Sequence, residues 1–172
     1  MLLALAALAV LCLLLMWGWT LPAIMAGSNG EAVFDLRNDG YGYDAAKAYV
    51  AQIKEPARRL YLREQRILDT GFAIGLAGGL ALAICMGLRR NFGRWALAGA
   101  VFPALAFYVD MLENAAVGRM LKTPLLSPEE VELASTYTVL KFQLYETSVL
   151  LLLLCVIGQV VRWSLGKFRG SQ

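Results

Sequence analysis

Histidine is absent from this chain of 172 residues, and cysteine occurs only three times. Without imidazole the chain cannot supply histidine-ligated haem, the usual zinc sites or a Ser-His-Asp triad. Cys12, Cys85 and Cys155 lie in apolar segments, too far apart for a Cys-x-x-Cys pair. We therefore interpret them as small buried hydrophobic residues, and these absences argue against metal and hydrolase centres that rely on histidine.

Charged residues are also scarce, at 17% of the chain, whereas 59% of residues are hydrophobic and the mean hydropathy is +0.57. A soluble core of this length could not hide so much apolar surface. A membrane span needs about 20 mostly apolar residues, and the segments that qualify are 2–25, 67–88, 95–118 and 137–161. The sequence predicts an all-α integral membrane four-helix bundle with up-down topology, a single membrane domain over residues 1–172.

The first apolar segment has no Lys or Arg before it and is longer than the roughly 7 to 15 residues of a secretory h-region. We expect it to remain as the first spanning helix rather than to be removed.

A long polar loop, residues 27–66, separates the first two spans. Apolar residues spaced three and four apart between Ala45 and Ile53 predict an amphipathic helix on the outer membrane surface. Asp44 is its expected N-cap, and Pro56 should end or kink it. Four arginines follow, and they either anchor a helix end by snorkelling or form a lip for anionic headgroups or an anionic substrate; they are Arg58, Arg59, Arg63 and Arg66.

Basic residues beside the spans predict the orientation. Arg89, Arg90 and Arg94 follow the second span, and Arg162, Lys167 and Arg169 follow the fourth, on the same side as the N-terminus. The positive-inside rule places that side in the cytoplasm, although the first loop holds seven Lys and Arg of its own, several beside the second span. We predict a multi-pass protein of the bacterial inner membrane with both termini inside.

Glycine recurs every fourth residue in the second span, at Gly71, Gly75 and Gly79. Small residues on one face allow two helices to approach closely, so the stripe predicts a packing surface. Its alternative role is to leave room for a lipid tail or a substrate.

Ionisable side chains inside spans are costly and typically mark a polar interior site. Asp110, Glu113 and Asn114 are spaced i, i+3 and i+4, which places them on one helical face, and Pro103 predicts a kink about two turns earlier.

The fourth span carries further polar residues. Lys141, Tyr145 and Ser148 share a face, whereas Glu146 points about 140° away from Lys141. With Asp69 at the start of the second span, an antiparallel bundle brings all these groups into one leaflet. The predicted binding residues are Asp69, Asp110, Glu113, Asn114, Lys141, Tyr145 and Glu146.

Three interpretations of this cluster compete. Lys141 could pair with Asp110 or Glu113 as a structural lock, at about 0.5 to 2 kcal/mol for each contact. The carboxylates could instead bind a cation, a cationic solute or a lipid headgroup. A third role is catalysis on a lipid, with Glu113 as general base and an oxygen-ligated Mg²⁺ or Ca²⁺ ion as a cofactor.

We favour a non-catalytic protein that recognises a lipid headgroup, a small polar or cationic solute or a partner subunit, and the alternative is a lipid-modifying enzyme. No metal site or other cofactor is expected from the motifs. Membrane lipid and a second copy or another membrane subunit are the expected partners. Nucleic acid is not, because the net charge of +3 is dispersed over helix ends and loops.

Short motifs over nearly the whole chain resemble a loose group of small bacterial four-span membrane proteins. They are Asp35, Gly42-Tyr43 and Ala45-Ala46 in the first loop, Arg59-Leu60-Tyr61 followed by Asp69, the D-x-x-E-N motif of residues 110–114, and Lys141. The resemblance implies four helices and a shared polar cluster and carries no known activity. Gly71-Phe72-Ala73 departs from it, since a proline is expected shortly after Asp69.

Overall fold

The computed structural model describes residues 1–123 and 125–169, and the regular elements of that part of the chain are all helices. Four stretches are long and apolar enough to cross a membrane, as an integral membrane protein requires: Leu2–Gly27, Glu55–Arg89, Gly93–Lys122 and Pro128–Ser164. The predicted all-α four-helix bundle is confirmed. The helices run beyond the predicted spans, most clearly before residues 67 and 137, because hydropathy marks only their apolar middle.

Each of the first three stretches contains a change of helix type. The first is α1 (Leu2–Leu15), the π-helical turn η1 (Met16–Thr20) and α2 (Leu21–Gly27); the second is α4 (Glu55–Leu60), the π-helical turn η3 (Tyr61–Gln65) and α5 (Arg66–Phe92). The third joins the 3₁₀ helix η4 (Gly93–Ala100) to α6 (Val101–Lys122), and the fourth is the single helix α7 (Pro128–Arg169).

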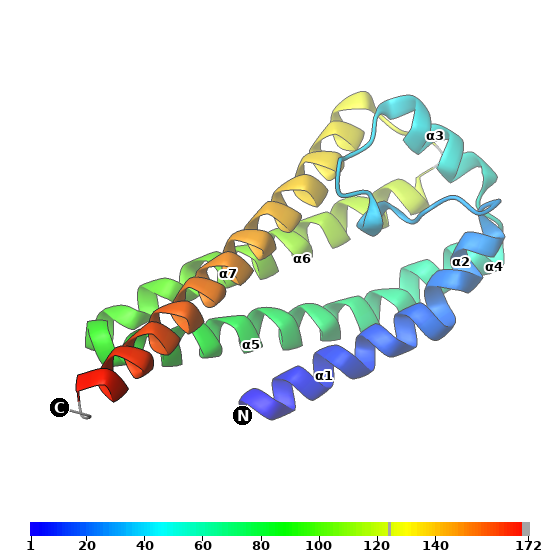
Figure 1. Ribbon diagram of the computed structural model, residues 1–172. Helices are drawn as coiled ribbons and strands as arrows, with labels where there is room; N and C mark the ends of the chain where they lie inside the picture. The colour runs from blue at the N-terminus through cyan, green and yellow to red at the C-terminus, as the bar shows by residue number, and fades with distance from the viewer. Residues whose placement is uncertain (124, 170–172) are drawn as a thin grey trace.

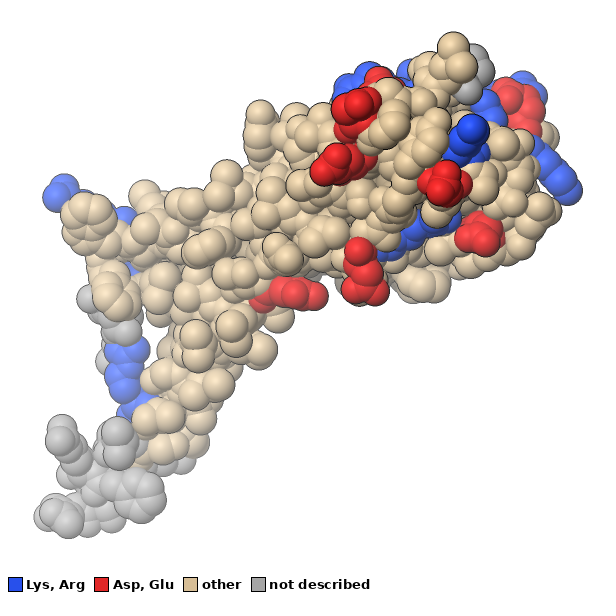
Figure 2. All heavy atoms as spheres, turned by 90° about the horizontal axis from the view of Figure 1, so that it is seen from above, with Lys and Arg blue, Asp and Glu red and all other residues tan. Residues whose placement is uncertain are grey.

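The helices follow an up-down order (Figure 1). α1 packs along α5, α6 packs along α7, and α5 also contacts α6 and α7. The N-terminus and the C-terminal end of α7 lie at one end of the bundle, whereas the first loop, with η2 (Phe34–Leu36) and α3 (Tyr43–Gln52), lies at the other. On the face that Figure 2 shows, Asp and Glu lie over the half that carries the first loop, and the charged side chains of the described residues at the opposite end are Lys and Arg.

The glycine stripe of α5 packs against α1. A Cβ atom on Gly75 would lie 2.7 Å from the backbone N of Ala9 and from the backbone O of Leu5, and one on Gly71 would lie 2.8 Å from Sγ of Cys12. The stripe therefore serves close helix packing within the chain. Any self-association would need another surface.

The first loop folds onto the end of the bundle. The predicted helix exists as α3, and Ala46, Tyr49 and Val50 on one of its faces are buried. They join a core with Val33 and Phe34 from the loop and with residues of α2, α6 and α7. This core lies at the end opposite the termini and fixes the position of the loop.

Two predicted features of that loop are wrong. Gly42, in extended backbone, precedes α3, and no side chain caps the helix, so Asp44 lies within its first turn. Pro56 does not end α3, which stops at Gln52; it lies in the first turn of α4, where the missing N–H has no intrahelical partner to lose.

The kink predicted at Pro103 is also misplaced. Pro103 lies in the first turn of α6, and the irregular backbone is the 3₁₀ helix η4 before it. Glu129, Glu130 and Glu132, which follow the third predicted span, belong to the first turns of α7.

Candidate functional site

Lys141 of α7 lies at the centre of a buried polar cluster. Its Nζ atom is 2.5 Å from Oε2 of Glu113 and 3.8 Å from Oδ1 of Asp110, both on α6. Thr138, one turn before Lys141, donates a hydrogen bond of 2.6 Å to Oε1 of Glu113. Both oxygens of Glu113 are thus engaged, and its side chain is fully buried.

Asp69 of α5 is held by a second set of contacts. Nδ2 of Asn114 donates a hydrogen bond of 2.7 Å to Oδ2 of Asp69, and Arg66 donates to Oδ1 of Asn114. The amide therefore connects a cation and a carboxylate on α5 through one side chain of α6, as a residue with both a donor and an acceptor can.

A cavity of about 260 Å³ adjoins these groups. Its polar wall is formed by Asp69, Asp110, Lys141 and Tyr145, together with Asp35 from the first loop and Gln65. Its apolar wall comes mainly from the first spanning stretch and the facing side of α5 and α7: Leu13, Met16, Trp17, Leu21, Leu36, Phe72, Leu76 and Phe142.

The cavity therefore lies between the first stretch and α7, and Trp17 on its wall is 60% exposed at the outer surface of the bundle. Buried polar groups such as Asp69, Asp110 and Lys141, together with the apolar side chains, give the cavity an amphipathic lining. Such a lining suits a ligand with a polar end and an apolar body.

Two carboxylates of this wall lack full hydrogen bonding among the described residues. Oδ1 of Asp35 and Oδ1 of Asp110 are buried without a hydrogen-bond partner, and Oδ2 of Asp110 receives only a long bond of 3.5 Å from Tyr145. Asp35 and Asp110 are 7% and 3% exposed. Buried acceptors of this kind normally receive a hydrogen bond, so these two oxygens point to a donor that the described residues do not supply.

The charges of the cluster are also unequal. The described residues place four buried carboxylates there, Asp35, Asp69, Asp110 and Glu113, against two cationic groups, Arg66 and Lys141. An excess of negative charge in a buried site has to be neutralised by bound protons or by a positive partner.

The two π-helical turns contact each other beside the cavity, and Met16 and Trp17 of η1 and Gln65 of η3 line it. Thr20 of η1 donates a short hydrogen bond to Oε1 of Gln65 in η3, and both side chains are buried. Nε2 of Gln65 lies 3.3 Å from Sδ of Met16. π-helical turns are rare and occur frequently at functional sites.

The structure separates Glu146 from the other predicted binding residues. Its side chain is exposed on α7 and lines a shallow apolar hollow with Phe142 and Val149, away from Lys141. The other six predicted residues are brought together by hydrogen bonds, ion pairs or the cavity wall.

The four predicted headgroup arginines have different environments. Arg66 lies in the buried cluster, and Arg58 donates a 2.7 Å hydrogen bond to the carbonyl of Val50. Arg59 pairs with Glu55 at 3.5 Å on the exposed surface, and Arg63 is exposed. Of the four, Arg59 and Arg63 are therefore the exposed ones.

Sequence reasoning missed Thr138 as a hydrogen-bond partner of Glu113 and Asp35 as part of the polar wall of the cavity. Thr138 had a signal, because it precedes Lys141 by three residues and so shares its helical face. Asp35 belongs to the first-loop motif of the resemblance, but no periodicity placed it at this site, since it lies in the short 3₁₀ helix η2.

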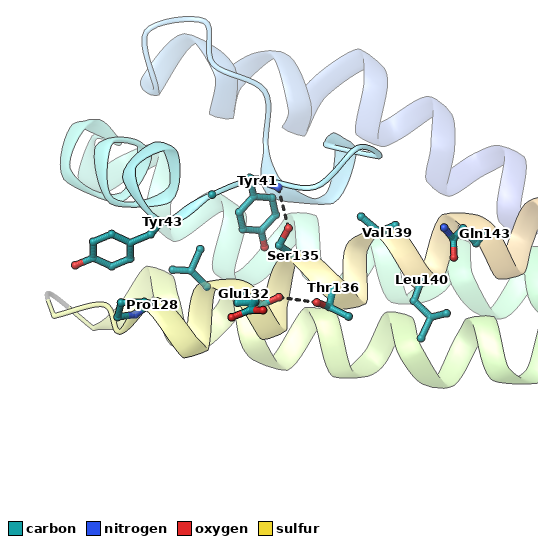
Figure 3. Close-up of a pocket in the computed structure, with 11 residues that line it drawn as sticks. Tyr41, Tyr43, Pro128, Glu132, Ser135, Thr136, Val139, Leu140 and Gln143 are labelled. Carbon is teal, nitrogen blue, oxygen red and sulfur yellow. Dashed lines mark hydrogen bonds between the residues drawn. The ribbon is translucent and has the colours of Figure 1, made fainter.

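A larger surface hollow of about 560 Å³ lies where the first loop meets α7 (Figure 3). The backbone N of Tyr41 donates a 2.8 Å hydrogen bond to Oγ of Ser135 across it. Gly40, at φ +82°, leaves no room for a side chain, because a Cβ atom there would lie 2.7 Å from the same oxygen. These contacts dock the loop, and the buried cluster lies elsewhere.

Burial changes the acidity of two tyrosines in that loop. It raises the pKa of Tyr49 to about 12 and the pKa of Tyr41 further above its ordinary value. Both phenols therefore stay neutral over the physiological pH range.

Comparison of the chain with family models, curated proteins and solved structures gives no match. The resemblance to small four-span proteins stays a prediction, and function has to be argued from the site itself. Among the described residues, no group of three or more His, Cys, Asp or Glu is arranged to hold a metal ion.

Proposed function

We propose that the protein binds an amphipathic molecule with a cationic headgroup in the cavity between the first spanning stretch and α7. The observation that carries this proposal is that Asp35 and Asp110, which both line the cavity, each have a buried carboxylate oxygen without a hydrogen-bond partner among the described residues. A protonated amine supplies the charge and the donors that these oxygens lack.

Lys141 supports the same ligand chemistry. Its closest contact is Glu113 at 2.5 Å, whereas Asp110 is 3.8 Å away, beyond the range of a strong hydrogen bond. Lys141 and Glu113 thus act as an internal pair, and Asp110 is the carboxylate available to a ligand. The apolar lining accommodates the tail, which would enter from the surrounding lipid past Trp17.

A matched ligand series tests this proposal. The protein in nanodiscs of phosphatidylcholine would be titrated with dodecylamine, dodecanol and dodecanoate, with the shift in thermal unfolding as the readout. We expect stabilisation by the amine and little by the alcohol or the carboxylate. The Asp110→Asn variant should bind the amine roughly 10- to 100-fold more weakly, from about 1.5 to 3 kcal/mol for a hydrogen bond to a charged group.

Glu146→Gln is the matched control, because it neutralises an exposed carboxylate that lies outside the cavity. It should bind the amine as the unchanged protein does. Equal stabilisation by all three compounds, or equal amine binding by Asp110→Asn, would contradict the proposal. Native mass spectrometry of the purified protein would then identify any lipid that it retains.

The alternative is a lipid-modifying enzyme with a carboxylate base. In this alternative Asp110 is the better candidate for the base, because Lys141 and Thr138 already engage both oxygens of Glu113. Lipid mass spectrometry after overexpression tests it: a changed lipid pool that returns to normal with Asp110→Asn would favour the enzyme.

A further inference from the structure

Another pocket lies at the opposite end of the bundle, at the corner between α5 and η4. It has a volume of about 510 Å³. Leu82, Met86 and Leu97 give it an apolar wall, and Arg89 and Arg94 line it from the two sides of the corner.

The corner is held in shape by the backbone. Gly93 has φ +53° and ψ −124°, a conformation that residues with a Cβ atom rarely adopt. Sγ of Cys85 donates a 3.4 Å hydrogen bond to the carbonyl of Ala96, which ties the end of α5 to η4. The pocket therefore belongs to a fixed turn of the chain.

The structure describes no acidic partner for the two arginines at this corner. Within the described part of the chain, neither Arg89 nor Arg94 forms an ion pair, and Arg94 only stacks at 5.8 Å from the centre of the Trp95 ring. The sequence has no Asp or Glu between Thr70 and Val109. On the face that Figure 2 shows, the charged side chains of the described residues at this end are Lys and Arg, without an Asp or Glu beside them.

We propose that this pocket binds the phosphate headgroup of an anionic phospholipid. The guanidinium groups of Arg89 and Arg94 bind the phosphate oxygens, and the acyl chain lies against Leu82, Met86 and Leu97. A free phosphate ion would use the arginines but not the apolar wall, and this difference favours the lipid. The site is independent of the acidic cavity and has the opposite charge preference.

The test compares the unchanged protein with arginine variants by two measurements. Native mass spectrometry reports how much phosphatidylglycerol each protein retains, and titration in phosphatidylcholine nanodiscs reports its apparent affinity for phosphatidylglycerol. Attraction of each basic residue to anionic lipid changes binding about fivefold, so the Arg89→Gln/Arg94→Gln protein should bind roughly 25-fold more weakly. Lys47→Gln/Lys54→Gln is the control, because it removes two exposed cations from the first loop at the other end. The control should retain phosphatidylglycerol fully.

The Arg89→Lys/Arg94→Lys protein distinguishes a loss of lipid binding from an effect on folding, since lysine keeps the charge and also binds phosphate. It should restore most of the affinity. Equal binding by the glutamine variant and the unchanged protein, or an equal loss in the control, would overturn the proposal. So would equal stabilisation by inorganic phosphate in phosphatidylcholine alone, which would identify a soluble anion as the ligand.

Discussion

Replacing Lys141 with Met should strongly destabilise the bundle. The change removes the cation that lies 2.5 Å from Glu113 and 3.8 Å from Asp110 and leaves both carboxylates buried. Removing one partner of a buried ion pair typically costs about 3 to 5 kcal/mol, and polar contacts in membrane bundles are weaker, so we expect a loss of about 3 kcal/mol.

A double-mutant cycle with Glu113→Gln makes this value a test of the pair itself. Glu113→Gln alone should cost about 1.5 kcal/mol, because Asp110 is close enough to move toward Lys141. The double variant leaves no unpaired charge at this pair. Its loss of stability should therefore be smaller than the sum of the two single-variant losses by roughly 2 kcal/mol.

The assay is reversible unfolding in mixed micelles with increasing sodium dodecyl sulfate, followed by circular dichroism. Glu146→Gln is the control and should stay within about 0.5 kcal/mol of the unchanged protein, since this side chain is exposed. A loss below about 1 kcal/mol for Lys141→Met, or strictly additive losses in the cycle, would refute the pairing.

Three further predictions concern other parts of the fold. Gly75→Ala should lower stability by about 1 to 3 kcal/mol in the same unfolding assay, because its Cβ would meet backbone atoms of α1 at 2.7 Å. Gly158→Ala is its control: a Cβ there would have nothing within 4 Å, so this change should be neutral or slightly stabilising. Thr20→Val should cost about 0.5 to 2 kcal/mol, measured by the same unfolding, because it removes the donor to Gln65. Because the pKa of Tyr49 is raised in the folded protein, its contribution to stability is fully present up to about pH 10 and should be lost between pH 10 and about 12. Thermal unfolding of Tyr49→Phe should therefore show a smaller decline in stability over that pH range.

Much of the fold follows directly from the sequence. Long apolar runs determine the four spans, since only a helix satisfies its own backbone hydrogen bonds in hydrocarbon. The four-residue glycine interval determined a close packing face, and its partner proved to be α1. Helical periodicity also placed Asp110, Glu113 and Asn114 on one face, as the structure has them.

Only the tertiary structure decided how these faces meet. The period of a helix fixes which residues share a face, but the rotation of each helix against its neighbours depends on packing along its whole length. Packing therefore decided that Lys141 approaches Glu113 more closely than Asp110, and that Glu146 faces outward. It also decided that Asp35 reaches the cavity, because an irregular turn has no repeating pattern and takes its position from the core beneath it.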